Sequence, residues 1–375
     1  MRNIFLLSFL CCAEVLMAAE RWSGKGLRLD RDGAIPVVFL SGSPEEIGRQ
    51  HGELMKEEII SLNAFLQMAS VQQMMTEKKN LFMGLDDLWK KAVPYIPERY
   101  VTEMDAMGNV AGISRENGHR IASFPEFFHC SGVAARGKAT TNGQVVHVRV
   151  LDYMREYNLQ KLAAIQIFMP DGMIPWISVG FGGLNGTITA MNANGLAIGE
   201  IGGRGEGNWD GIPMSFLMRR IVEECSTVAE ARELLKKAKL TCEFFYVLSD
   251  KSGNLASVWA EYGKPPHIAM AGEKGDFLPE AFEDIAWYTR PSRMDALRAR
   301  IHEYYGKIDV ETMKQLIKPP VAMDSNLQDV IFLPQTLELH VTYAGVSTLA
   351  CDEPYSHVDF GKLLEHYKNA LKNRP

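Results

Sequence analysis

A cysteine, an arginine and an aspartate are spaced in a way that could form a nucleophilic site. Cys130 is followed by Arg149, and Asp152 comes three residues after the arginine. A thiolate attacks carbonyl carbons, a nearby cation lowers the pKa of a thiol, and a carboxylate can hold the nucleophile or its amine in place. A lone cysteine is more often a small buried hydrophobe, and an Arg-x-x-Asp pair more often a surface ion pair. The positions of the three residues relative to one another therefore decide between the two interpretations.

A predicted hairpin relates these residues. Asn142-Gly143 between two alternating stretches is a strong signal for a two-residue turn. With that turn Asp152 opposes Val133, which places it about three residues, or roughly 10 Å, along the strand from Cys130. A bulge or a bent strand end would bring the carboxylate closer, and both Arg149 and Asp152 could then face the thiol.

The cysteine pattern predicts neither a disulfide framework nor a zinc site. Cys11 and Cys12 lie in the apolar run at the start of the chain. The other four are scattered and form no C-x-x-C pair: Cys130, Cys225, Cys242 and Cys351. We therefore expect no metal and no organic cofactor, and at least one free thiol.

The motifs around Cys130 resemble those of a known family, the acyl-coenzyme A:6-aminopenicillanic acid acyltransferases. These are cysteine N-terminal-nucleophile hydrolases, related to choloylglycine hydrolase, penicillin V acylase and acid ceramidase. Each motif is weak alone, but their order and spacing over most of the chain are fairly specific. The motifs are Gly42-Ser43-Pro44-Glu45-Glu46-Ile47-Gly48 with His51-Gly52, Phe127-Phe128-His129-Cys130-Ser131-Gly132, Asn142-Gly143, Arg149-x-x-Asp152-Tyr153, Gly183-x-Asn185-Gly186, Met191-Asn192-x-x-Gly195-Leu196, and Asp324-x-Asn326-Leu327.

The resemblance implies an α+β protein with the four-layer αββα N-terminal-nucleophile hydrolase fold and stacked antiparallel sheets. It implies an inactive precursor that cleaves itself between His129 and Cys130. Cys130 then becomes the first residue of a second chain, and its free α-amine, with a pKa of about 8, serves as the local base. Cys130 is the implied nucleophile of a thioester mechanism, and Arg149 and Asp152 orient and polarise it.

The resemblance also implies residues for the oxyanion hole and for substrate binding, although the motifs around these residues match less closely. The place of one oxyanion-hole side chain of the choloylglycine relatives falls near Gly202, which offers only its backbone N–H, so Asn192 is the expected side-chain donor. The relatives' Thr-Asn-Pro segment is Thr289-Arg290-Pro291 in this chain, which would favour anionic substrate groups. Arg293 matches a later arginine of the relatives, and we expect Arg290 and Asn326 to bind substrate.

The elements before Cys130 are predicted to be helical. Ser43, Pro44 and Glu46 form a capping box with proline in the first turn, and apolar residues follow at helical spacing to Ile59. Further helices are expected around 88–92 and 100–110.

After Cys130 the pattern changes to short strands. Besides Asn142-Gly143, turns are predicted at Asn194-Gly195, at 250–253 and at Pro334-Gln335, and four hairpins indicate antiparallel sheets. Helices are expected at 214–222, at 227–238 and at 293–305, and a long loop at 263–284. Strands interrupted by amphipathic helices favour sheets stacked face to face and covered by helices.

The start of the chain has the outline of a secretory signal. Arg2 precedes an apolar run from Ile4 to Met17, and Ala18-Ala19 offers small residues for cleavage. We expect 1–19 to be a signal peptide, 20–129 a helical pro-segment, and 130–375 the catalytic chain, in a periplasmic or secreted protein. The pro-segment is expected to pack on the catalytic chain in one αββα domain. Cys11 and Cys12 leave a lipoprotein anchor as the alternative.

Composition limits the partners. Among 375 residues 46% are hydrophobic and 23% are charged, values typical of a globular protein, and the net charge of −6 with no basic block gives no support to nucleic-acid binding. The expected substrate is a small N-acyl amide or a peptide, and a membrane span is not expected.

Three alternatives remain beside the N-terminal-nucleophile interpretation. One is a papain-like pair of His129 and Cys130, although neighbouring residues of a strand point to opposite faces. The second is a lipid-amide hydrolase, and the third a binding protein that keeps the fold without catalysis.

Overall fold

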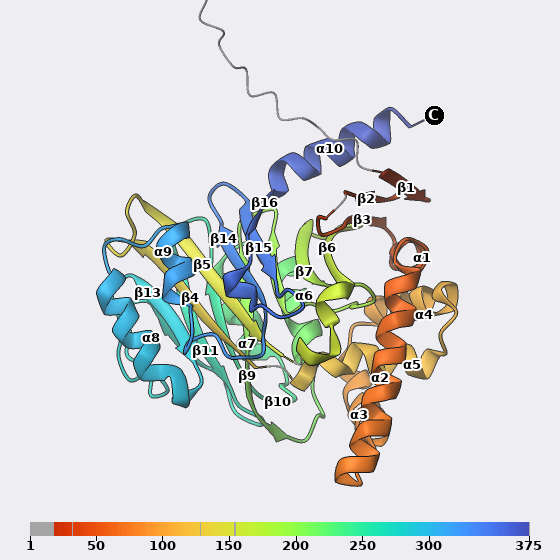
Figure 1. Ribbon diagram of the computed structural model, residues 1–375, viewed down its shortest axis with the longest axis horizontal. Coiled ribbons are helices and arrows are strands. Elements are labelled where there is room, and N and C mark those ends of the chain that lie inside the picture. The colour runs from red at the N-terminus through yellow and green to blue at the C-terminus, as the bar shows by residue number, and fades with distance from the viewer. Residues whose placement is uncertain (1–18, 32, 128, 154, 375) are drawn as a thin grey trace, which may run out of the picture.

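The structure is a computed structural model, and it describes residues 19–31, 33–127, 129–153 and 155–374. Two sheets are stacked in the centre, with helices α1 to α5 on one side and α8 and α9 on the other (Figure 1). The predicted signal peptide falls on residues of which all but Ala19 lie outside the described part.

The larger sheet has ten strands in the order β1-β2-β3-β6-β7-β8-β9-β10-β11-β12. Every pairing in it is antiparallel except β3 with β6, which is parallel. Its strands are β1 (Ala19–Ser23), β2 (Gly26–Asp30), β3 (Val37–Gly42), β6 (Ala163–Pro170), β7 (Trp176–Phe181), β8 (Thr189–Asn192), β9 (Ala197–Gly207), β10 (Cys242–Ser249), β11 (Leu255–Ala260) and β12 (His267–Met270).

The smaller sheet has six strands in the order β13-β4-β5-β14-β15-β16, all antiparallel. Its strands are β4 (His129–Gly137), β5 (Gly143–Asp152), β13 (Ile285–Thr289), β14 (Asn326–Leu333), β15 (Glu338–Tyr343) and β16 (Ser356–Asp359). Successive side chains of each strand point to opposite faces of this sheet, so they contribute to two hydrophobic cores, one on each face. Val330 and Phe332 of β14 pack against the larger sheet, whereas Val148 and Val150 of β5 face the outer helices.

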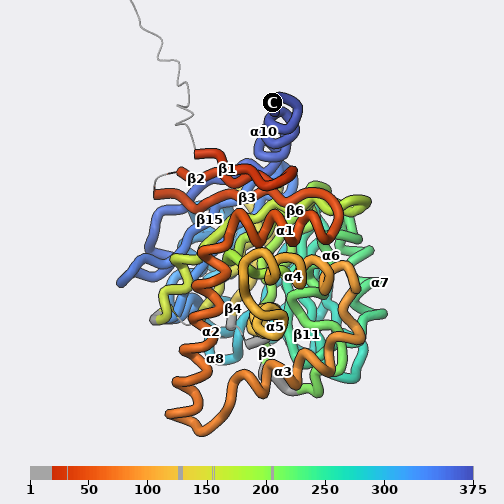
Figure 2. Tube along the Cα trace, turned by 90° about the vertical axis from the view of Figure 1, so that its right-hand side faces the viewer, coloured from red at the N-terminus to blue at the C-terminus, as the bar shows by residue number. Residues whose placement is uncertain are grey.

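Helices form the outer layers. Those at the start of the chain lie in front of the larger sheet in Figure 2. Their bounds are α1 (Pro44–Leu54), α2 (Lys56–Glu77), α3 (Leu81–Ala92), α4 (Glu98–Ala111) and α5 (Arg115–Ser123). The later helices are α6 (Met214–Glu224), α7 (Val228–Lys237), α8 (Pro291–Tyr304), α9 (Val310–Leu316) and α10 (Phe360–Lys372), with short 3-10 turns at Val93–Tyr95, Phe124–Phe127, Arg155–Tyr157, Leu159–Leu162 and Ala350–Asp352. The expected four-layer αββα arrangement is confirmed.

Local signals for the first helices are confirmed in part. Ser43 caps α1, and Glu46 closes the capping box. The helical spacing to Ile59 is interrupted at Met55, where α1 ends and α2 begins. The segment 20–129 is also not purely helical, because β1 to β3 supply three strands of the larger sheet.

A buried ion-pair cluster joins this segment to the later chain. Arg219 of α6 is 1% exposed and bonds both carboxylate oxygens of Glu103 on α4, at 2.8 and 2.6 Å. It also bonds Glu223 at 2.8 Å, and Tyr100 of α4 donates to the same glutamate at 2.7 Å. A buried guanidinium needs such complete pairing, so α4 and α6 are held in one arrangement.

Two of the expected loops differ from the structure. Three of the four predicted hairpin turns are present, but Asn142-Gly143 is not a two-residue turn, because β4 already ends at Gly137 after a bulge. The register is therefore shifted, and Asp152 opposes His129 instead of Val133. The expected loop at 263–284 contains the edge strand β12. Among the described residues, no helix is both long and apolar enough to cross a bilayer.

Candidate active site

Cys130 and Arg149 lie on adjacent strands and touch through their side chains. Cys130 is the second residue of β4 and is paired with Leu151 of β5. Arg149 Nη2 donates to Cys130 Sγ at 2.8 Å, and both side chains are fully buried. The corrected register produces this contact, because it moves the end of β5 towards the start of β4.

Glu200 lies against both Cys130 and Arg149 and forms a cluster with them. It was not predicted from the sequence. It projects from β9 of the facing sheet. Its Oε2 lies 3.2 Å from Cys130 Sγ and 2.9 Å from Arg149 Nη2, and Arg149 Nε donates to its backbone oxygen at 3.2 Å. A signal was present in the sequence, since Glu200 is a single acid between Ile198-Gly199 and Ile201, and a charge in an apolar strand needs a partner.

Gly199 makes room for the arginine. A Cβ atom at this position would lie 2.5 Å from Arg149 Cγ and 2.8 Å from Arg149 Cβ. Any larger residue would therefore push the guanidinium away from Cys130 Sγ.

Asp152 lies on the opposite face of the smaller sheet from the thiol and is connected to Cys130 through Arg293. Its carboxylate pairs with Arg293 of α8, which also donates to the backbone oxygen of Cys130 at 3.0 Å and to that of Val321 at 2.7 Å. Met323 N donates to the second oxygen of Asp152 at 3.0 Å. The thiol therefore faces Arg149 and Glu200, whereas the backbone oxygen of Cys130 is held by Arg293, which is itself paired with Asp152.

Burial and the neighbouring charges favour the neutral form of the Cys130 thiol. Burial raises the pKa of Cys130 well above its usual range, while the charge of Arg149 opposes this and that of Glu200 reinforces it. Burial also raises the pKa of Glu200, against the opposing effect of Arg149. The sulfur accordingly donates its hydrogen to Glu200, and the carboxylate is placed to accept that proton.

Two polar atoms of the cluster have no hydrogen-bond partner among the described residues. They are Arg149 Nη1, a donor, and Glu200 Oε1, an acceptor, and both are buried. An amide offers the complementary pair, a carbonyl oxygen and an N–H group. Unpartnered buried polar atoms are costly, and their presence beside a buried thiol is compatible with a binding site.

The structure does not bring Asn192 to Cys130, which corrects the expectation that it supplies the oxyanion hole. Its Nδ2 donates to the backbone oxygens of Val222 and Cys225 at 2.9 and 2.7 Å, and its Oδ1 accepts from the backbone of Asn194 and Leu196. All its strong bonding positions are used to join the β8–β9 turn to the end of α6.

The two expected substrate-binding residues have structural partners. Arg290 precedes α8 and donates to the backbone oxygen of Gly203 at 2.8 Å. Asn326 is fully buried, donates to Asp329 at 2.9 Å and accepts from the backbone of Cys351 at 2.8 Å. Asn326 is the strand partner of Asp152, so it lies behind the site rather than facing the thiol.

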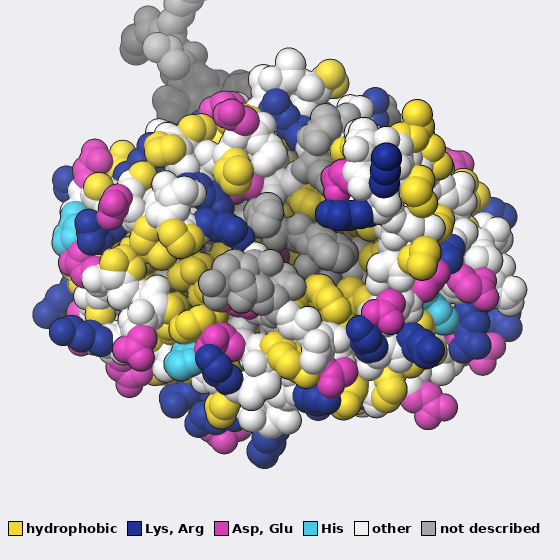
Figure 3. Space-filling model, turned by 90° about the horizontal axis from the view of Figure 1, so that it is seen from below, with side chains coloured by type: hydrophobic (Ala, Val, Ile, Leu, Met, Phe, Trp, Pro, Cys, Tyr) yellow, Lys and Arg dark blue, Asp and Glu magenta, His cyan; other side chains and the backbone are white. Residues whose placement is uncertain are grey.

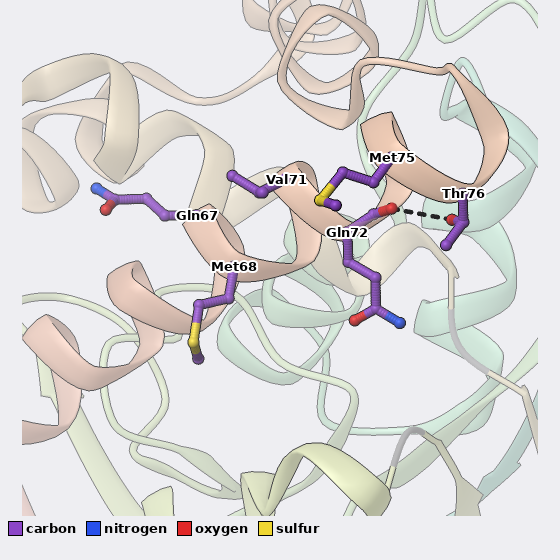
Figure 4. Close-up of a pocket in the computed structure, with 6 residues that line it drawn as sticks. All are labelled: Gln67, Met68, Val71, Gln72, Met75 and Thr76. Atoms are coloured by element: carbon purple, nitrogen blue, oxygen red, sulfur yellow. Dashed lines mark hydrogen bonds between the residues drawn. The ribbon is translucent and has the colours of Figure 1, made fainter.

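A surface cavity lies along helix α2. It has a volume of about 490 Å³ and is lined by Met68, Val71 and Met75 together with polar side chains of that helix (Figure 4). On the face seen in Figure 3, hydrophobic side chains are interspersed with Lys and Arg and with Asp and Glu.

The side chain of His129 is not described, so its predicted part in cleavage stays a prediction. The described part of the chain contains no disulfide, and all four described cysteines are buried.

Comparison with known proteins agrees with the resemblance predicted from the motifs. Residues 168–274 match the family model of acyl-coenzyme A:6-aminopenicillanic acid acyl-transferase. The predicted family resemblance is confirmed. The chain is also 26% identical over 329 residues to protein dcd1A of Dictyostelium discoideum, covering 75% of this chain and 73% of that protein. Protein dcd1B of the same organism is 23% identical and covers 95% of this chain and 77% of its own length.

Two solved structures align with part of the chain. An N-acylethanolamine-hydrolyzing acid amidase ortholog of Caenorhabditis elegans aligns with a TM-score of 0.45 and 16% identity, covering 55% of this chain and 93% of the other. Penicillin V acylase of Agrobacterium tumefaciens aligns with a TM-score of 0.43 and 16% identity, covering 62% and 87%.

Proposed function

We propose that the chain is a self-cleaving cysteine hydrolase or acyltransferase that acts on the amide bond of an N-acyl small molecule or peptide. The family match supports the reaction class. The observation that carries the residue assignment is the 2.8 Å contact between Arg149 Nη2 and Cys130 Sγ, with Glu200 within reach of both. A thiol between a cation and a proton acceptor is equipped to become a nucleophile.

The first proposed reaction removes the segment before Cys130. The sulfur attacks the carbonyl carbon of His129, its proton passes to Glu200, and the peptide C–N bond breaks as the nitrogen of Cys130 takes up that proton. The resulting thioester between His129 and Cys130 is hydrolysed by water. This leaves a carboxylate on His129 and returns the proton to the sulfur.

The second proposed reaction uses the new α-amine. The amine takes the thiol proton, and the thiolate attacks the carbonyl carbon of the substrate amide while Arg149 faces the developing oxyanion. The C–N bond breaks, and the leaving amine takes the proton from the ammonium group of Cys130. Water or an acceptor amine then resolves the thioester, which gives hydrolysis or acyl transfer.

Burial of the sulfur fits the uncleaved precursor. Cys130 is fully buried while its peptide bond to His129 is intact, so substrate reaches it only after neighbouring residues move. We propose that cleavage permits this movement, and that the chain is exported through its first 19 residues.

Intact mass measurement of the purified protein tests this proposal. We expect two fragments, 20–129 and 130–375, from the wild type and a single chain from Cys130→Ala. Cys225→Ala is a matched control, because Cys225 is also a buried free cysteine but lies at the end of α6, and it should cleave normally. An uncleaved wild type that hydrolyses amides would contradict the mechanism. An uncleaved and inactive wild type would favour a binding protein of the same fold.

A lipid amide is the second candidate substrate. The observation in its favour is that α2 exposes Met68, Val71 and Met75, each residue being 61–79% accessible to solvent. A series of N-acyl amides of increasing chain length would distinguish the two, because a lipid-amide hydrolase should gain kcat/KM with each added methylene group, whereas a small-amide or peptide enzyme should not.

A further inference from the structure

A second buried carboxylate lies beside the site on the outer face of the smaller sheet. Asp329 of β14 is fully buried. It accepts hydrogen bonds from Asn326 Nδ2 at 2.9 Å and from the hydroxyl of Tyr355 at 3.0 Å. The reactions proposed above do not use this acid, and an acid that is buried without a cation in contact requires an explanation.

Asn326 connects this acid to the site. It is the strand partner of Asp152, and its Nδ2 also lies 3.4 Å from the backbone oxygen of Leu151. Its Oδ1 accepts from the backbone of Cys351 at 2.8 Å. The orientation of the Asn326 amide is therefore set by Asp329 on one side and by Cys351 on the other.

The chain before Asn326 wraps around the Asp152–Arg293 pair. Val321 offers its backbone oxygen to Arg293, and Met323 donates its N–H to Asp152 at 3.0 Å. Tyr153 N donates to the backbone oxygen of Ser325 at 2.9 Å. Any movement of this segment, 321–326, would change the position of the Asp152–Arg293 pair, and Arg293 holds the backbone oxygen of Cys130.

We propose that Asp329 is a positioning residue for the reactions of Cys130: through Asn326 it fixes the segment 321–326 and thereby the Asp152–Arg293 pair that holds the Cys130 backbone. The inference rests on the proposed function, and it adds a residue that neither the motifs nor the family resemblance indicated.

The protonation state of Asp329 controls these contacts. Both of its partners act as donors, and the ionised carboxylate can accept from both. A protonated acid can donate to the Tyr355 hydroxyl, which can accept, but it then offers Asn326 Nδ2 only a neutral carbonyl oxygen, a weaker acceptor than a carboxylate. The ionised form is therefore the one that holds segment 321–326.

Burial, together with the surrounding groups, places the titration of Asp329 in the neutral range. Burial raises the pKa of Asp329 to about 7, the negative charge of Asp152 on β5 adds to this, and Asn326, Tyr355 and the charge of Arg149 oppose it. Cys351, whose thiol is neutral at this pH, also faces this acid. Lys314 of α9 lies 4.9 Å from the centre of the Tyr355 ring, the ring whose hydroxyl bonds Asp329.

The test measures self-cleavage in cell-free translation at several pH values between about 6 and 8.5, the range that spans this transition. The readout is conversion of the full chain into its two fragments on a denaturing gel, which needs no known substrate. For the wild type we expect the cleavage rate to rise with pH through a transition near the pKa of Asp329.

Asp329→Asn should behave at every pH like the protonated acid. We expect the transition to disappear and the rate above it to fall by about tenfold, since misplacing a reacting group by 1 Å can cost about 100-fold. Tyr355→Phe keeps the carboxylate but removes one donor, so the transition should move to higher pH. A purely structural role of Asp329 would lower the rate by the same factor at all pH values.

Thr342→Val is the matched control. Thr342 is the strand partner of Asp329 on β15, is 2% exposed, and its hydroxyl has no hydrogen-bond partner among the described residues. This variant should keep the wild-type profile. If the wild-type chain cleaves and Asp329→Asn has the same dependence of cleavage rate on pH, the positioning role is overturned but the proposed function is not. A wild-type chain that does not cleave would overturn the proposed function and the positioning role with it.

Discussion

Arg149 Nη2 lies 2.8 Å from Cys130 Sγ, although the two residues are nineteen positions apart in the sequence. The contact exists because β4 and β5 are antiparallel neighbours and because Gly199 of the facing sheet leaves space for the arginine. The same guanidinium bonds Glu200, so one cation contacts both the thiol and the carboxylate.

Arg149→Met should stop self-cleavage. The substitution removes the cation that lowers the pKa of the thiol and leaves the buried Glu200 without its partner. Removing one member of a buried ion pair typically costs about 3–5 kcal/mol, so we also expect a lower free energy of unfolding. Chemical denaturation and a denaturing gel measure the two effects. The double variant with Glu200→Gln should recover much of the stability without recovering cleavage. Cleavage by either variant would contradict the role assigned to Arg149.

Glu200→Gln should separate proton transfer from packing. Glutamine preserves the shape and one hydrogen bond to Arg149, but it accepts no proton. General acid–base groups typically contribute about 100- to 10,000-fold, and we expect a loss of cleavage rate in that range. The rate is measured by intact mass over time, with Glu103→Gln as the control for removal of a buried acid elsewhere. A variant that cleaves at the wild-type rate would show that another group accepts the proton.

Asn192→Ala should affect stability and not chemistry. The amide joins the β8–β9 turn to the end of α6, and loss of buried hydrogen-bond partners costs about 1–3 kcal/mol. Thermal unfolding should therefore occur at lower temperature, whereas the cleavage rate of the folded protein should be unchanged. A drop in cleavage rate with unchanged unfolding would restore the oxyanion-hole role that was expected from the sequence.

His147 should make the protein sensitive to acid. Burial lowers the pKa of this histidine to about 3, and its Nδ1 bonds the hydroxyl of Ser249 at 2.8 Å. The folded state therefore binds fewer protons than the unfolded state between pH 3 and about 6.5, and stability falls as the pH falls through that window. The slope for one such group is about 1.4 kcal/mol per pH unit. Urea denaturation at several pH values should show a smaller slope for His147→Gln, and equal slopes would contradict this account.

Patterns of short range predicted much of this architecture. The capping box at Ser43, three hairpin turns and the helices near Met214 and Thr227 were visible because neighbouring residues determine them. The turn at Asn142-Gly143 was wrong because contacts distant in sequence determine it. The chain from Lys138 to Thr141 follows Ile308, whose backbone bonds both Ala139 and Thr141.

The site was predicted only where a motif marks it. Cys130, Arg149, Asp152 and Arg293 were named from the sequence, and the structure brings them together. Glu200 was missed because its strand has no motif. Asn192 was expected at the thiol, but its amide bonds the end of α6, and the sequence does not reveal which neighbours a turn residue will bond. The layers could be expected from the alternation of strands and helices, but contacts across the two sheets could not.

The parallel pairing of β3 with β6 has a consequence for the proposed self-cleavage between His129 and Cys130. Six residues of β3 form a continuous ladder with a strand that lies beyond the scissile bond, and Glu103 is locked to Arg219 across the same boundary. Breaking the peptide bond would therefore yield two polypeptides that remain interlocked as a permanent heterodimer. They should elute together under native conditions and come apart only in denaturant.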